Sequence, residues 1–244
     1  ICGTYCKTEL SGGVFILGSR RFESPAIYAL SAGDAQQMST RTINQIIGQY
    51  TESELSTAVL ESRFDGDDEL LIVRLARHTL VFNLTAAKKI GADSAWSVLS
   101  TGVSGAPWIA CNGVFVPYLN KWLYGSIADG AIFALDYESA SQDGDYCEME
   151  FETPLIEAPF ARIGKIELNT VTGFQAEQTN CFISTSLDGE LESSEYVQLY
   201  GNKGNYTTRF VAWGFGYYNK QLSLRVRTLS KDKVNFSKLT VTYG

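Results

Sequence analysis

The chain has 244 residues, of which 45% are hydrophobic and 19% charged, and its formal net charge is −7. This length can bury a sizeable core as one large β domain or two smaller ones, and no apolar run approaches the roughly eighteen residues of a membrane span. The acidic balance and the lack of long lysine or arginine runs argue against a protein that binds nucleic acid tightly by neutralising phosphates. A surface along which DNA slides without sticking fits this charge, and an ordinary acidic protein fits it equally well.

The cysteines do not form a recognisable metal or disulfide pattern. They occur at Cys2, Cys6, Cys111, Cys147 and Cys181. Their number is odd, no C-x-x-C occurs, and Cys2 and Cys6 have no matching pair of ligands downstream. We therefore predict free, largely buried thiols in a reducing cytoplasm.

The first residues show no basic flank followed by an apolar segment, so they do not resemble a secretory signal. The chain also begins without Met. We expect it to be a fragment of a longer protein.

The first predicted elements are two strands within residues 13–30, separated by the charged turn at 20–23. A segment with sustained helical periodicity follows over residues 39–64. Its apolar side chains recur at i, i+3, i+4 and i+7 and continue in a second turn: Ile43, Ile46, Ile47, Tyr50, Leu55, Ala58 and Val59. Thr51 and Glu54 have the spacing of a capping box. We predict a helical insertion over 41–62 that projects from a β scaffold.

Two apolar runs come next, at residues 69–75 and 79–84, and they predict a β-hairpin whose turn contains His78. The acidic link over 64–69 superficially resembles a calcium loop, but the EF-hand spacing and the distal glutamate are absent. A solvated turn is the better interpretation.

The rest of the chain consists of short predicted strands with turn signals between them. A polar stretch over 138–146 is the best internal break. The strands are expected at residues 95–102, 107–118, 121–127, 131–137, 147–157, 162–172, 180–186, 196–200, 206–214, 221–229 and 234–243. In Leu222–Arg227, leucines and Val226 alternate with Ser223 and the two arginines, which predicts a strand with one apolar face.

We therefore predict a mainly β fold of antiparallel meanders, similar to a β-propeller with irregular blades. The predicted regions are 1–137, with the helical insertion, and 147–244, packed together as one β-rich unit.

Enzymatic motifs are absent from the sequence. His78 is the single histidine and has no serine or cysteine beside it, and G-x-S-x-G, a phosphate loop and H-E-x-x-H do not occur. The turn at Asp188-Gly189 resembles the hairpin turns of sialidase-type propellers, where the aspartate has a structural role. Together with the acidic surplus, this turn leaves open a propeller glycan-binding module or glycoside hydrolase.

The stretch Trp213–Tyr218 is rich in aromatic residues. It fits a buried strand end followed by an exposed aromatic loop, or a surface that stacks on sugars or contacts a protein. The candidate contact residues are Gln45, Gln49, Trp213, Phe215, Tyr217 and Tyr218.

Several short matches, in order along the chain, resemble one known family. They lie at residues 3–8, 24–28, 39–54, 71–82, 96–102, 151–155, 186–189, 209–213 and 222–226. In this order they are similar to the packaged-DNA stabilisation protein of short-tailed phages that infect enteric bacteria. The chains of that family extend further at the N-terminus, so this chain resembles their C-terminal portion. The stretch after Trp213 departs from the family, whose members tend to be basic there.

The resemblance implies a structural component of the virion tail, assembled in the host cytoplasm. Members of the family form a ring, thought to be a hexamer, beneath the portal and its adaptor. They close the channel after packaging, carry the tail needle, adjoin the tailspike and later form part of the ejection conduit. Double-stranded DNA would pass through without sequence-specific binding. The resemblance implies no catalytic residues, no cofactor and no metal.

Overall fold

The computed structural model describes residues 1–19, 23–31, 33–103, 105–136, 139–157, 159–187, 193–200, 203–218 and 220–243. The chain divides into two compact units. The N-terminal unit comprises Ile1–Ser100 and Ala106–Ala134, and the C-terminal unit comprises Thr101–Gly105 and Leu135–Gly244. The predicted regions 1–137 and 147–244, and their packing as one unit, stay a prediction, and each unit is described by itself.

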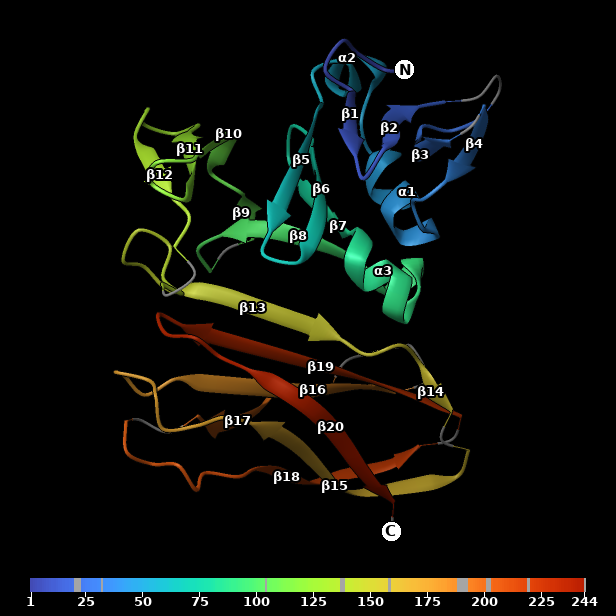
Figure 1. The fold of residues 1–244 in the computed structure, drawn as a ribbon. Helices are drawn as coiled ribbons and strands as arrows, with labels where there is room; N and C mark the ends of the chain where they lie inside the picture. Colours follow the sequence, from blue (N-terminus) through green and yellow to red (C-terminus); the bar gives the residue numbers. More distant parts are fainter. Residues whose placement is uncertain are drawn as a thin grey trace. The chain divides into compact units, whose positions relative to one another are not determined.

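The N-terminal unit contains three antiparallel sheets built from strands that follow one another along the chain (Figure 1). The first sheet is β1 (Lys7–Leu10), β2 (Gly13–Gly18), β3 (Ala26–Ser31) and β4 (Asp34–Gln37). The second is β5 (Val59–Asp65), β6 (Asp68–Arg74), β7 (Thr79–Asn83), β8 (Trp96–Thr101) and β9 (Ala106–Pro107). The third is β10 (Ala110–Val116), β11 (Lys121–Ser126) and β12 (Ile132–Ala134). The predicted mainly β fold of antiparallel meanders is confirmed.

Helices are short and lie between strands. They are α1 (Arg41–Ile47), α2 (Glu52–Ser56), α3 (Leu84–Ile90) and the 3-10 turn η1 (Ala92–Ser94). Thr51 and Glu54 form the predicted capping box at the start of α2. The prediction of helix up to residue 62 is wrong after Ser56, because Val59–Asp65 pairs with β6 along its whole length. No helix in the described residues is long and apolar enough to span a membrane.

Helix α3 was not predicted. Asn83 ends strand β7 and also caps the helix, since its side chain accepts a hydrogen bond from the Ala86 amide at 2.8 Å. Gly91 follows the helix at φ 93°, a conformation that glycine adopts without strain. The Asn and Gly signals lie in the sequence, but the apolar run into Leu84 obscured the change from strand to helix.

The helices α1 and α2 pack into the core and do not project from the scaffold as predicted. Ile43, Ile47 and Leu55 are buried in one hydrophobic cluster with side chains of the first two sheets, including Leu17 and Phe82. Moving such apolar area out of water stabilises the fold by roughly 25 cal/mol per Å². The helical segment therefore joins the first two sheets, and only its polar side is available to a partner.

A polar contact fixes the corner between α1 and α2 to the β6–β7 turn. The Tyr50 hydroxyl accepts a hydrogen bond from the Arg77 amide at 3.2 Å and lies 2.6 Å from His78 Nδ1, to which it can donate. The Arg77 guanidinium lies 4.5 Å from the Tyr50 ring centroid and binds the Glu54 carboxylate at 2.7 Å. Burial, and then the charge of Arg77, lowers the pKa of His78, which favours the neutral ring that this hydrogen bond from Tyr50 requires.

The C-terminal unit consists of two antiparallel sheets (Figure 1). One has the order β13-β19-β16-β17, with β14 also paired to β19; the other has the order β18-β15-β20. The strands are β13 (Cys147–Glu152), β14 (Ile156–Glu157), β15 (Ala161–Thr170), β16 (Asn180–Leu187), β17 (Tyr196–Leu199), β18 (Phe210–Tyr218), β19 (Gln221–Ser230) and β20 (Phe236–Tyr243).

The two sheets of this unit pack face to face as a sandwich. Side chains from both sheets share its hydrophobic clusters, for example Ile183 and Val226 with Phe210. Strand β19 has the predicted alternation, because Leu222, Leu224 and Val226 are fully buried and Arg225 and Arg227 face outward. Each sheet thus keeps one face for the core and one for the surface.

We expect Tyr50→Phe to destabilise the protein by about 1–3 kcal/mol, because it leaves the Arg77 amide and His78 Nδ1 without their partner in a partly buried site. Urea unfolding monitored by circular dichroism measures this change. Tyr5→Phe is the matched control, since Tyr5 is 70% exposed and its replacement should leave the unfolding midpoint unchanged. Equal midpoints for the two variants would show that the Tyr50 hydroxyl does not stabilise the corner.

Candidate functional site

The predicted contact residues divide between surface and core. Gln45 and Gln49 are exposed on the polar side of α1 and just after it. Trp213 is 64% exposed and Tyr217 is 53% exposed, and both lie on strand β18. These four residues are available to a partner.

Two of the predicted contact residues have core positions. Tyr218 is fully buried and its hydroxyl donates to Thr185 Oγ1 at 2.9 Å, so its prediction as a surface contact is wrong. Phe215 is partly buried against the hydrophobic clusters of the sandwich. The physical reason is that Gly214 and Gly216, at φ 81° and 89°, form a bulge within β18, which turns alternate rings inward and outward.

Among the residues that the structure describes, the sequence patterns that suggested catalysis do not form a reactive site. His78 contacts Tyr50 in the hairpin turn described above. Burial raises the pKa of Cys181 to about 12 and also raises the pKa of Cys147, so neither thiol is a nucleophile at neutral pH. No group of three or more His, Cys, Asp and Glu side chains among the described residues could hold a metal ion. The turn at Asp188-Gly189 lies outside the described residues.

A cavity of about 580 Å³ lies in the C-terminal unit. Its lining includes the apolar side chains of Met149, Phe174 and Val234. Its carboxylate, from Asp232, accepts a hydrogen bond from the Ala176 amide at 2.6 Å, and Gln175 Nε2 donates to a backbone carbonyl at 2.9 Å. These polar groups hold loops in place.

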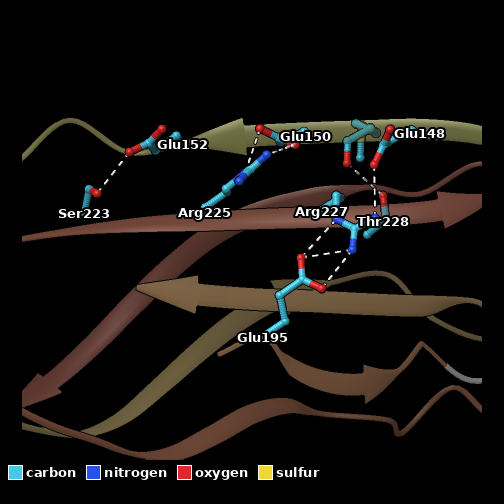
Figure 2. Close-up of polar contacts among 9 residues, drawn as sticks. Glu148, Glu150, Glu152, Glu195, Ser223, Arg225, Arg227 and Thr228 are labelled. Atoms are coloured by element: carbon cyan, nitrogen blue, oxygen red, sulfur yellow. Dashed lines mark hydrogen bonds and ion pairs between the residues drawn. The ribbon is translucent and has the colours of Figure 1, made fainter. Parts of the chain in front are cut away.

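The outer face of the β13–β19–β16–β17 sheet carries a ladder of charges, which we call the acidic face (Figure 2). Its charged residues are Glu148, Glu150, Glu152, Glu157, Glu195, Arg225 and Arg227. Arg227 points from β19 toward a glutamate on each side, Arg225 points toward Glu150 on β13, and the carboxylates outnumber the arginines. Val197 and Leu199 on β17 are 54% and 50% exposed, and their cross-strand register places them on the same face.

Arg227 holds the ladder together. Its guanidinium binds Glu148 at 3.1 Å on one side and Glu195 at 2.8 Å on the other, and it lies 4.4 Å from the ring centroid of Phe182 (Figure 2). Hydrogen bonds to Glu195 and Glu148 raise the pKa of Arg227 above its ordinary value. Arg225 binds both oxygens of Glu150 at 2.8 Å. These contacts link β13 and the start of β17 through the central strand.

The outer face of the β18–β15–β20 sheet has the opposite charge, and we call it the basic face. Its charged residues are Arg162, Lys165, Arg209, Lys238 and Glu167. Glu167 accepts from Lys165 at 2.8 Å and from Arg209 Nε at 3.1 Å, which lowers the pKa of its carboxyl. Trp213 and Tyr217 lie on the same face, and Lys165 Nζ is 5.9 Å from the Trp213 ring centroid.

The sequence contained a signal for the acidic face and little for the basic one. In Cys147–Glu152, glutamates alternate with apolar side chains, as arginines do in β19, and the two patterns match once the strands are paired. The basic residues come from β15, from β20 and from Arg209 just before β18, which lie far apart in the chain. A register shift between Ile163 and Lys165 also breaks the alternation of β15, so their common face depends on the fold.

We expect Arg227→Leu to destabilise the protein by about 1–3 kcal/mol, because Glu148, whose side chain is 17% exposed, loses its charged partner. Arg225→Leu is the matched comparison, and it should cost less than about 1 kcal/mol because the Arg225–Glu150 pair is more exposed. Chemical unfolding of both variants at low and high salt measures the difference. An equal loss of unfolding free energy in the two variants would mean that the burial of the Arg227–Glu148 pair adds nothing to stability.

Comparisons with known proteins agree with this architecture. A family model described as "Bacteriophage P22 Gp10, beta-propeller" matches residues 1–140, and one described as "Bacteriophage P22 Gp10, beta-sandwich" matches residues 148–244. The chain is 28% identical over 239 residues to the "Tail hub protein gp10" of Salmonella phage P22. The match covers 97% of this chain and 49% of that relative, so the chain spans about half the length of the curated relative.

The first model alone matches more than half of the chain, and the second covers most of the rest. The propeller-like prediction is confirmed for the first region, whereas the second region matches a sandwich. Three sheets of sequential antiparallel strands followed by a two-sheet sandwich are the architecture that these descriptions name. The chain belongs to the bacteriophage P22 Gp10 family of phage stabilisation and tail hub proteins.

Proposed function

We propose that this protein is a structural component of the phage tail hub that closes the portal channel after DNA packaging, stabilises the packaged genome and takes part in its ejection. The observation that carries the proposal is the ordered match of two family models to both parts of the chain. The P22 relative is named a tail hub protein, and it is similar along 97% of this chain. In this role the protein binds other tail components and closes the portal channel, and it does not catalyse a reaction.

The charges of the protein suit a conduit for DNA. The net charge is −7, so the molecule as a whole repels a polyanion, and sequence-specific base contacts are not needed in this role. Double-stranded DNA passes through the assembled hub without sequence-specific binding. The protein functions in the virion tail, and it is assembled in the host cytoplasm, where its five unpaired cysteines stay reduced.

The proposed partners are further copies of the protein in a ring, expected to be a hexamer, together with the portal adaptor, the tail needle and a contact with the tailspike. The described structure offers surfaces rather than pockets for such partners. They are the polar side of α1 with Gln45 and Gln49, and the outer faces of the sandwich. Extended protein surfaces are what ring assembly requires.

We expect phage particles that lack this protein to package DNA and then lose it, because the channel stays open. DNA that remains in purified particles, measured as nuclease-resistant DNA per capsid, checks this. Supplying the protein in trans should restore retention. Particles that retain their full DNA content without the protein would contradict the proposed function.

We also expect Gln45→Arg combined with Gln49→Arg to weaken tail assembly while leaving the unfolding midpoint unchanged, because both side chains are exposed on a helix whose opposite side is buried. Incorporation of the variant into particles is the measurement. Gln36→Arg on strand β4, where the side chain is also exposed, is the control and should be incorporated normally. Normal incorporation of the double variant would show that the surface around Gln45 and Gln49 does not contact another tail component.

A further inference from the structure

We propose that copies of this protein associate head to tail through the sandwich, with the basic face of one copy bound to the acidic face of the next. The inference rests on the proposed function in one respect: it names the surfaces through which the proposed ring forms. It is argued from the charges and exposed side chains of the C-terminal unit alone.

Charge is separated by sheet in this unit. Among the described residues, the acidic face carries five glutamates and two arginines, and the basic face carries four basic residues and one glutamate. The two faces therefore have net charges of equal size and opposite sign. A positive face is unexpected in a chain whose net charge is −7, so its presence calls for a partner of negative charge.

The basic face also carries the side chains that anchor protein interfaces. Trp213 and Tyr217 are more than half exposed on it, and aromatic residues with arginine dominate the binding energy of many interfaces. Arg162 and Lys238 are exposed, and in the described part of the chain no carboxylate pairs with either of them. These two cations are available to the next copy.

The acidic face offers matching groups. Glu157 is exposed at the end of the ladder and, within the described residues, no basic side chain pairs with it. Glu152 accepts a hydrogen bond from Ser223 at 3.0 Å, and no cation among the described residues binds its second oxygen. Val197 and Leu199 provide exposed aliphatic surface on which the rings of Trp213 and Tyr217 can pack.

The geometry makes this contact heterologous. The two faces lie on opposite sides of one sandwich, since the two sheets bury their other faces against each other. A copy that binds a neighbour through its basic face keeps its acidic face free for another neighbour. Such contacts continue from copy to copy and form a closed ring when the rotation between neighbours returns to the first copy, whereas a two-fold symmetric dimer would use the same face twice.

Nucleic acid is a less suitable occupant of the basic face. Lys165 and Arg209 are already paired with Glu167, which reduces the charge available for phosphates. A polyanion would also leave the acidic face and its exposed Val197 and Leu199 without a role. Contact with further copies of the chain pairs the charges of both faces, because each basic face meets an acidic face.

The test uses two variants that each disable one face. Arg162→Glu with Lys238→Glu alters the basic face, and Glu152→Gln with Glu157→Lys alters the acidic face while keeping an acceptor for Ser223. Lys7→Glu with Lys89→Glu is the control for the basic-face variant, since both lysines are exposed in the N-terminal unit and the change in charge is the same. Unfolding midpoints and circular dichroism check that every variant folds.

Sedimentation velocity at low and high salt then measures association. We expect the unaltered protein and the control to form oligomers that dissociate at high salt, and each face variant to be monomeric. An equimolar mixture of the two face variants should form a heterodimer that does not grow, because only one intact pair of faces remains. Trp213→Ala should raise the dissociation constant about tenfold or more.

Three results would overturn the proposal: an unaltered protein that stays monomeric at low salt, face variants that associate as the unaltered protein does, or a mixture that does not pair. Loss of binding to a duplex DNA fragment by the basic-face variant, with association unchanged, would identify a nucleic-acid surface instead. The experiment on particles that lack the protein distinguishes a failure of the proposed tail hub function from a failure of the proposed interface. If particles without the protein lose DNA but the face variants associate normally, the tail hub function stands and this interface is wrong.

Discussion

The register of strand β19 is the constraint on which the C-terminal unit depends. This strand pairs with β13, β14 and β16, so its position sets that of every other strand in the sheet. Its leucines and Val226 fill the core while Arg225 and Arg227 bind glutamates outside. A shift by one residue would place both arginines in the core, at a cost far above the free energy of a typical single contact. The two arginines of the ladder therefore also hold β19 in its register, because a shifted strand would bury their charges.

The N-terminal unit is stabilised by a hydrophobic core that two helices share with its first two sheets. Its sheets are made of neighbouring strands and are joined by the helices α1 and α2, whose apolar side lies in a core shared by the first two sheets. Tyr50 orients this segment against the β6–β7 turn through the Arg77 amide and His78. The single histidine of the chain thus has a structural role, and the helical segment presents only its polar side to solvent.

Both units suit a protein that acts through surfaces. The titratable side chains with shifted pKa values are held by burial or by structural hydrogen bonds, as His78, Cys181 and Glu167 illustrate. Polar groups in the cavity of the C-terminal unit hold loops. What distinguishes this unit is the separation of charge between two outer faces, together with exposed Trp213 and Tyr217 on one of them. Exposed aromatic side chains beside charged groups are typical of surfaces that bind other proteins.

The sequence by itself determined most strands, the β6–β7 hairpin, the capping box at Thr51 and the alternation of β19, because each depends on a short-range period or spacing. Only the tertiary structure decided that residues 59–65 form a strand, that Tyr218 is buried and that the basic residues share a face. These outcomes depend on pairing between distant segments and on bulges that shift the alternation, and neither is encoded in any local window. Local periodicity predicts which side chains share a face of one strand, whereas register between strands decides which faces meet.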